Sequence, residues 1–187
     1  MENLKFESWR EFKSCFSDSL FGKHCNFKMG NFVFRGQGNS DWKITSSLDR
    51  NPIFSKFNCS QKKSIEMNIV ERFIENCTFH ISSFESAQYR FNEKNGMATC
   101  RDTLHKSLSL AQHHGVPTRL VDWSYSPYIA AFFAFASSDS YDADKVSIYA
   151  LDISNSIWGR PDGVSIVKDF STKNRNLIHQ RGLFTHN

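Results

Sequence analysis

The sequence predicts an α+β fold with a single domain, built from a small mixed or antiparallel sheet and several packed helices. Two observations support this. Segments with apolar residues at helical spacing are interspersed with short apolar runs typical of strands, without regular βαβ repetition. The chain also has 187 residues, of which 40% are hydrophobic and 18 are Phe, and this is enough for one aromatic-rich core.

The first part of the chain predicts two helices and one strand. Apolar residues at near-helical spacing predict an amphipathic helix over residues 4–20. Residues 32–34 are a short β-like run broken by Gly36 and Gly38, which would place Arg35 at a strand end. Residues 61–79 predict a second helix, with apolar residues at steps of four, and the polar segment 82–98 predicts a loop or a frayed helix.

The next segment predicts a helix with defined ends. Thr99 is a plausible N-cap, and Cys100, Leu104, Leu108 and Ala111 would form its buried stripe. Gly115 is expected just past the helix end, where a left-handed residue is common, and Pro117 prevents continuation.

The remaining elements alternate between strand and helix. A strand is expected over residues 118–123, and Ser126-Pro127 marks a helix start with Ser as N-cap and Pro at the first helical position. That helix is apolar on all sides, so we expect it to be fully buried. An acidic surface turn at 139–144 precedes a central strand over 145–152, and 164–167 predicts another short strand.

Charge and cysteine content limit the function classes. The formal net charge of +4 permits an anionic ligand, but the basic residues lack the clustering of a dedicated DNA-binding face. Five cysteines without a C-x-x-C pair fit neither a zinc site nor a disulfide framework. The charged N-terminus is no signal peptide, and the longest apolar run is too short to span a bilayer. We therefore expect reduced thiols, no membrane association and a cytoplasmic location.

The segment Phe34-Arg35-Gly36-Gln37 is the first candidate site. The guanidinium of Arg35 is a rigid donor fork that suits phosphate or carboxylate groups. The flanking glycines would allow a ligand to approach the backbone closely. The structural alternative is an arginine that pairs with a buried carboxylate.

Residues 112–123 are the second candidate site. Their sequence, QHHGVPTRLVDW, brings two His, an Arg, an Asp and a Trp between a helix end and an apolar helix. Buried polar groups need partners, and a functional cleft is one place where they find them. Adjacent histidines point in different directions on a helix and make a poor metal pair. The structural alternatives are an Arg119–Asp122 ion pair and a core position for Trp123.

Taken together, the motifs resemble the FRG domain, a family named for its Phe/Tyr-Arg-Gly motif and found mainly in bacteria and phages. The matching segments are FRGQ at 34–37, W-x-I-x-x-S-L-x-R at 42–50, QHHGVPTRLVDWS at 112–124 and Q-x-G-x-F at 180–184. The resemblance runs from about residue 30 to the C-terminus. It implies an N-terminal helix within residues 1–29 that packs on an FRG domain at 30–187.

The pattern is also similar to that of ADP-ribosyltransferase-like folds, which implies NAD as substrate and no metal. Gln180 would stand where many transferases carry a catalytic Glu, and Asp122 could supply the negative charge that glutamine lacks. The catalytic candidates under this resemblance are His114, Asp122 and Gln180. The cofactor-binding candidates are Arg35, Gly36, Gln37, Thr118, Arg119 and Trp123. We expect these two sets to converge on one cleft.

Three functional hypotheses follow. The leading one is an NAD-using, ADP-ribosyltransferase-like effector of the toxin or phage-defence type, with a protein or nucleic acid as acceptor. The second is a non-catalytic nucleotide-binding or sensing module that uses the same cleft. The third is a nuclease with His113 or His114 as general base, which the missing carboxylate cluster for Mg²⁺ disfavours.

Overall fold

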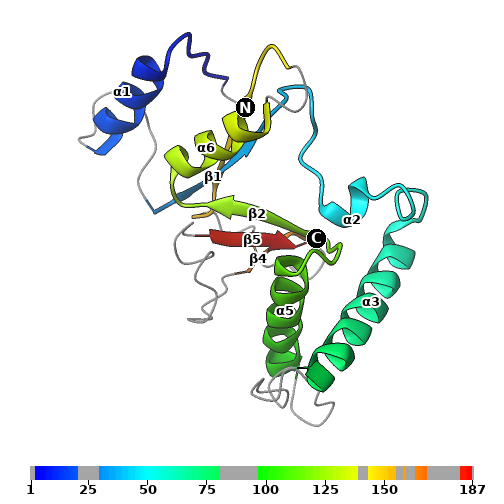
Figure 1. Ribbon diagram of the computed structural model, residues 1–187. Coiled ribbons are helices and arrows are strands. Elements are labelled where there is room, and N and C mark those ends of the chain that lie inside the picture. Colours follow the sequence, from blue (N-terminus) through cyan, green and yellow to red (C-terminus); the bar gives the residue numbers. More distant parts are fainter. Residues whose placement is uncertain are drawn as a thin grey trace. The chain divides into compact units, whose positions relative to one another are not determined.

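The computed structural model describes residues 3–20, 30–80, 97–138, 143–154, 158, 163–167 and 182–186. It has an α+β fold with an antiparallel sheet, as the sequence predicts (Figure 1). The chain divides into two compact units, and β2 (Leu120–Ser124) contributes residues to both. The first unit comprises Met1–Trp42 and Trp123–Trp158, and the second comprises Lys43–Asp122 and Gly159–Asn187.

The described residues of the first unit form two helices and antiparallel strands. Its strands are ordered β3-β1-β2, with β1 at Phe32–Gln37 and β3 at Ser147–Asp152. The register pairs Phe32 with Asp152 and Gln37 with Ser147, so β1 and β3 pair along their whole length. The helices are α1 (Trp9–Leu20) and α6 (Pro127–Ser138).

Strand β1 corrects two predictions. Arg35 does not lie at a strand end, because β1 continues through Gly36 to Gln37 and Arg35 pairs with Tyr149 of β3. A Cβ added at Gly36 would overlap the backbone carbonyl of Ala130, so the glycine permits α6 to pack directly on the strand. In addition, β3 is an edge strand among the described strands rather than the predicted central one.

Helix α6 begins as predicted but is not fully buried. The Ser126 hydroxyl accepts a hydrogen bond from the Ile129 backbone N–H at 3.4 Å, which confirms its N-cap role. The small residues Ala130, Ala131 and Ala134 are buried and face the core. The backbone of α6 at Ala130 and Ala134 lies directly against Gly36. The large rings point away, and Phe132 is 65% exposed and Phe135 55% exposed. The apolar pattern identified the helix but not which of its faces would be covered.

Aromatic rings fill the core of the first unit. Phe12 and Phe16 of α1 lie with ring centroids 4.8 Å apart, and Phe16 meets Phe34 of β1 edge to face at 5.5 Å. These rings pack on Ala130 and Ala131. The helix begins at Trp9 rather than at residue 4, because Ser8 accepts a hydrogen bond from the backbone N–H of Glu11 and so caps it.

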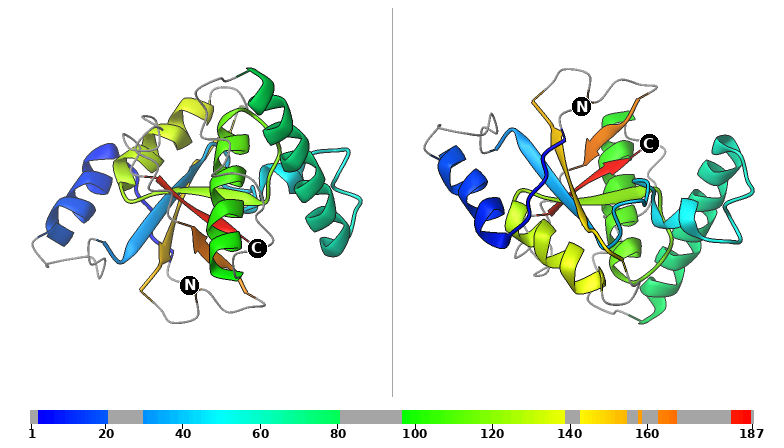
Figure 2. Two further views of the ribbon diagram at one scale, coloured as in Figure 1. Left: turned by 90° about the horizontal axis from the view of Figure 1, so that it is seen from below. Right: turned by 90° about the horizontal axis from the view of Figure 1, so that it is seen from above.

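The second unit packs two long helices beside the other strands. These helices are α3 (Cys59–His80), close to the prediction, and α5 (Met97–His113), and they lie side by side (Figure 2). A short helix, α2 (Ser47–Arg50), precedes them. The strand order is β2-β5-β4, with β4 at Ser165–Val167 and β5 at Gly182–His186. The core residues are Val70, Leu108, Ala111, Leu120, Val167 and Phe184.

Helix α5 ends as predicted but starts earlier. It already includes Met97, so Thr99 lies inside it and is not the N-cap. At the other end Gly115 has φ of +81°, its N–H donates to the Gln112 carbonyl, and the Val116 N–H donates to the Ala111 carbonyl. This pair of bonds is a Schellman motif, and it fixes where the chain turns toward β2.

Several predictions fall mainly outside the described residues. Only the last two residues of 82–98 are described, and they belong to α5. The acidic turn predicted at 139–144 lies largely outside the described residues, and Gln180 lies wholly outside them. Strand β5 was not predicted. Among the helices that the structure describes, none is long and apolar enough to cross a membrane.

Among the cysteines that the structure describes, Cys15 differs from expectation. Cys15 of α1 is disulfide-bonded, although the sequence predicted reduced thiols. Disulfide pairing depends on which thiols meet in space, and spacing along the chain does not encode this. Cys59, the first residue of α3, is an exposed free thiol.

Candidate functional site

A pocket of about 380 Å³ lies within the second unit. Its volume is at the lower end of the range for small-molecule sites. The wall combines two cations, a carboxylate, two hydroxyls and several apolar side chains. It is lined by Ile44, Ser46, Asp49, Cys59, Lys62, Arg119, Val121, Val164 and Thr185.

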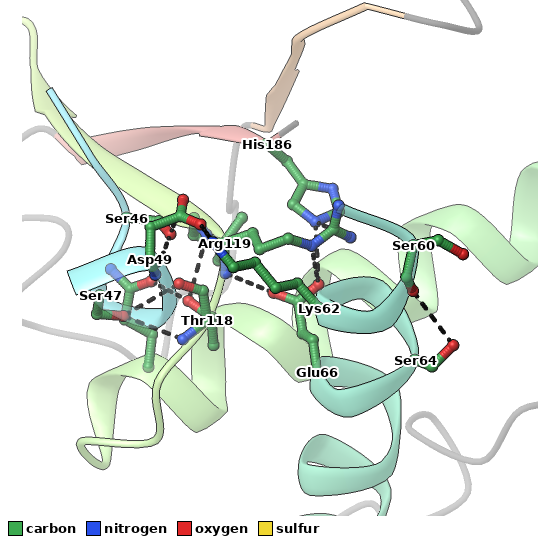
Figure 3. A network of polar contacts seen from close by, with 12 residues as sticks. Ser46, Ser47, Asp49, Ser60, Lys62, Ser64, Glu66, Thr118, Arg119 and His186 are labelled. Carbon is green, nitrogen blue, oxygen red and sulfur yellow. Dashed lines mark hydrogen bonds and ion pairs between the residues drawn. The ribbon is translucent and has the colours of Figure 1, made fainter. Parts of the chain in front are cut away.

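Arg119 reaches the pocket from the segment just before β2 and is held by Glu66 of α3. Its Nε donates to Glu66 Oε2 at 2.7 Å, and its backbone N–H donates to Glu66 Oε1 (Figure 3). Glu66 is 1% exposed and Arg119 is 9% exposed. A carboxylate buried this deeply requires a charged partner. Glu66 therefore fixes both the backbone and the guanidinium of Arg119 relative to α3.

His186 of β5 completes this cluster. Its Nε2 lies 3.0 Å from Arg119 Nη2 and 3.4 Å from Glu66 Oε2. Burial by itself would raise the pKa of Glu66, but the contacts with His186, the Arg119 amide and the Arg119 guanidinium together lower it. Glu66 is thus an anion at neutral pH, and the cluster joins α3, β5 and the start of β2.

A second ion pair stands at the pocket wall. Lys62 Nζ lies 2.7 Å from Asp49 Oδ1, and the Ser46 hydroxyl donates to Asp49 Oδ2 at 2.7 Å. Ser46 also caps α2, since its oxygen accepts from the Asp49 backbone N–H. Burial acts to raise the pKa of Asp49, but the bonds from Lys62 and Ser46 outweigh it and lower the pKa. Asp49 is therefore ionised.

Thr118 fastens α2 to the segment before β2. Its backbone N–H donates to Ser47 Oγ at 3.0 Å, and its carbonyl accepts from the Leu48 N–H at 3.0 Å. The Thr118 hydroxyl donates to Gln112 Oε1, and Gln112 Nε2 donates to Asp122 Oδ1 at 2.6 Å. Thr118 is fully buried, whereas Asp122 is exposed. These hydrogen bonds fix the position of the segment before β2, which carries Arg119.

The predicted site residues lie in both units. Arg35, Gly36 and Gln37 lie on β1 of the first unit, where α6 meets Gly36 and Gln37 is buried. Trp123, at the end of β2, is buried in the same unit.

The other predicted residues belong to the second unit. Thr118 and Asp122 both bond to Gln112, while Arg119 lines the pocket. His114 lies beyond the end of α5, with its ring centroid 5.7 Å from that of Phe73. Gln180 is outside the described residues, and the convergence of the whole set on one cleft stays a prediction.

Four residues of this site were not predicted from the sequence: Glu66, Asp49, Lys62 and His186. The signal for Glu66 was present, because it lies one helical turn before Val70, on the buried face of α3. A carboxylate in a buried stripe indicates a buried partner. The apolar residues at steps of four that predicted this helix include Ile65 and Ile69, which are only half-buried. The described residues contain no group of three or more His, Cys, Asp or Glu that could hold a metal ion.

Comparison with known proteins identifies the family. The family model for the FRG domain matches residues 30–143, from just before β1 to beyond α6. No match was found among curated proteins or among solved structures. The match includes Glu66, Lys62 and Arg119, but not His186. Because it covers more than half of the sequence, the chain belongs to the FRG domain family.

Proposed function

We propose that this protein binds a small nucleotide in the pocket of the second unit, with NAD as the leading ligand. The observation that carries the proposal is that Lys62 and Arg119 line one pocket together with the hydroxyls of Ser46 and Thr185. Ammonium and guanidinium groups bind phosphate oxygens, and hydroxyls bind ribose.

The second support is the rigidity of the two cations. Arg119 is held by Glu66, and Lys62 is 16% exposed and held by Asp49. Side chains that are already ordered lose little further entropy when a ligand arrives, so more of the interaction energy appears as affinity. The apolar groups of Ile44, Val121 and Val164 offer a surface for a flat ring.

Cleavage of NAD, as in an ADP-ribosyltransferase-like effector of the toxin or phage-defence type, is the second candidate. It is supported by Asp49, an ionised carboxylate in the pocket wall, since positive charge develops on the ribose when the nicotinamide bond breaks. The resemblance to transferase folds adds His114, Asp122 and Gln180 as candidate catalytic residues. A protein or nucleic acid would be the acceptor.

Cys59 provides a built-in test of binding, because its exposed thiol lines the pocket. The rate of Cys59 alkylation by iodoacetamide would be followed by peptide mass spectrometry, with NAD, with AMP or with adenosine. We expect NAD and AMP to slow alkylation and adenosine, which lacks phosphate, to protect much less. An unchanged rate at saturating NAD would refute binding at this pocket.

Release of nicotinamide from NAD separates an enzyme from a binding module. If Asp122 supplies the negative charge, as the transferase resemblance implies, Asp122→Asn should lower turnover on the order of a hundredfold and leave NAD binding intact, because that charge would act in the transition state. Gln180→Glu should keep or raise turnover. If the folded parent chain binds NAD but releases no nicotinamide with any acceptor, and Gln180→Glu gains none, the protein is a binding module.

A further inference from the structure

The ion pair between Lys62 and Asp49 leaves donors on Lys62 for a ligand. Lys62 Nζ and Asp49 Oδ1 lie 2.7 Å apart in the pocket wall (Figure 3). An ammonium group has three N–H donors. Among the residues that the structure describes, the Lys62 ammonium donates to Asp49 alone. The other donors are therefore available to a group that enters the pocket.

Asp49 has acceptor capacity left at the same place. Its Oδ1 accepts from Lys62, and its Oδ2 accepts from the Ser46 hydroxyl at 2.7 Å. Each oxygen of a carboxylate has two acceptor positions, so one position remains on each. The side chain of Asp49 is 39% exposed, and a ligand in the pocket can reach both positions. Burial acts against ionisation, but the bonds from Lys62 and Ser46 keep the pKa of Asp49 below its ordinary value.

Lys62 and Asp49 suit different parts of one ligand. The ammonium can only donate and attracts a phosphate, whereas the carboxylate can only accept, repels a phosphate and binds hydroxyls. With hydrogen bonds of ordinary length on either side, the pair bridges a phosphate oxygen and a hydroxyl up to about 8 Å apart. The phosphate and the sugar hydroxyls of a single nucleotide lie within this separation.

The two remaining acceptor positions match the diol of ribose. A ribose carries hydroxyls on two neighbouring carbons, and each can donate to one oxygen of the same carboxylate. A deoxyribose lacks one of them. When such a sugar enters, one position of Asp49 loses its water without gaining a donor, and this lowers the affinity.

We propose that Asp49 makes the pocket selective for ribonucleotides over deoxyribonucleotides, by binding the ribose diol of the nucleotide whose phosphate Lys62 holds. The inference rests on the proposed nucleotide binding in this pocket. It goes further in naming the sugar that the site requires and the residue that recognises it.

Calorimetry with AMP and with 2′-deoxy-AMP on the full chain tests the inference. We expect the parent to bind AMP on the order of tenfold more tightly, the effect of one charge-assisted hydrogen bond. Asp49→Asn keeps the shape of the side chain but has one neutral oxygen, and its preference should fall to about threefold or less. The ratio of two affinities on one protein cancels effects of the substitution on folding. The matched control is Asp144→Asn, an exposed aspartate outside the pocket wall, which should keep the preference of the parent.

The outcomes separate this inference from the proposed function. Equal affinities of the parent for the two nucleotides would overturn the inference, leave the proposed function intact, and need no folded variant. A tenfold preference that Asp49→Asn retains would overturn the role of Asp49. Absence of binding of AMP, 2′-deoxy-AMP and NAD would overturn both the inference and the proposed function.

Discussion

The two units bury different kinds of side chain. In the first, phenylalanine rings of α1 and β1 pack on the alanines of α6. In the second, a comparable apolar core is accompanied by an ionised glutamate and an arginine. Glu66 and Arg119 are the two charged residues that are buried in the described part of the chain, and both belong to the second unit.

This difference supports the proposal that a ligand binds to the second unit. A buried ion pair is often no more stabilising than well-packed apolar residues of the same volume, so stability alone does not explain its presence. Ionisable groups with shifted pKa values beside a pocket are typical of functional sites. The first unit therefore illustrates packing, and the second combines packing with a charged site.

The largest effect is expected at the close contact between β1 and α6 in the first unit. Gly36→Val would place its Cβ on the backbone carbonyl of Ala130, which cannot move unless α6 separates from β1. We expect a loss of about 4 kcal/mol or more in the free energy of unfolding, or failure to fold. Chemical denaturation measures it. A variant as stable as the parent would show that α6 does not rest on β1 and would undo the comparison.

Disruption of the buried ion pair between Glu66 and Arg119 should have the second-largest effect on stability. Glu66→Gln keeps the shape of the side chain but leaves Arg119 without its carboxylate, and we expect a loss of about 3–5 kcal/mol. The matched control is Glu71→Gln, an exposed glutamate on the same helix, which should change stability by less than about 0.5 kcal/mol. Equal effects from both variants would mean that the buried pair contributes nothing specific.

The pH dependence of the stability difference between the parent and Glu66→Gln tests the same ion pair. The folded state lowers the pKa of Glu66, so its contribution is fully present above the unfolded-state value of 4.5 and is lost as pH falls through the folded-state pKa. The stability difference between parent and variant should therefore be constant near neutrality and shrink in acid below about pH 4.5. A difference that grew on acidification would contradict the lowered pKa.

The smallest effect is expected on the outer face of α6. Phe132 is 65% exposed, so Phe132→Gln should alter stability by less than about 0.5 kcal/mol. Ala131→Gln, on the face that meets the core, should lose about 1–3 kcal/mol through overpacking. Thermal melts of the two variants compare the faces directly. A large loss at Phe132 would restore the original expectation of a fully buried helix.

The sequence was sufficient for elements with local signals. The Ser126 cap, the Gly115 turn and the long helix α3 follow from side chains acting on nearby backbone, and all three were predicted. Features that depend on contacts between residues far apart in the sequence were not predicted. Which face of α6 is covered depends on Gly36, far away in the sequence.

The pocket is the clearest case of this limit. Arg119 was selected from its motif, but its partners come from α3 and β5, and no local pattern links positions 66, 119 and 186. Of these partners, only Glu66 could have been identified from the sequence, because its carboxylate lies on a buried helical face. The family motif thus located one member of the cluster, and the fold supplied the others.

The central claim is that the charged pocket of the second unit is the ligand site. The measurement is NAD affinity by calorimetry for Lys62→Met and Lys63→Met, neighbouring substitutions that remove the same charge, one inside the pocket wall and one exposed. We predict about tenfold or greater weakening for Lys62→Met, from loss of a charge-assisted bond to phosphate, and no change for Lys63→Met. Equal affinities in the two variants would contradict the account.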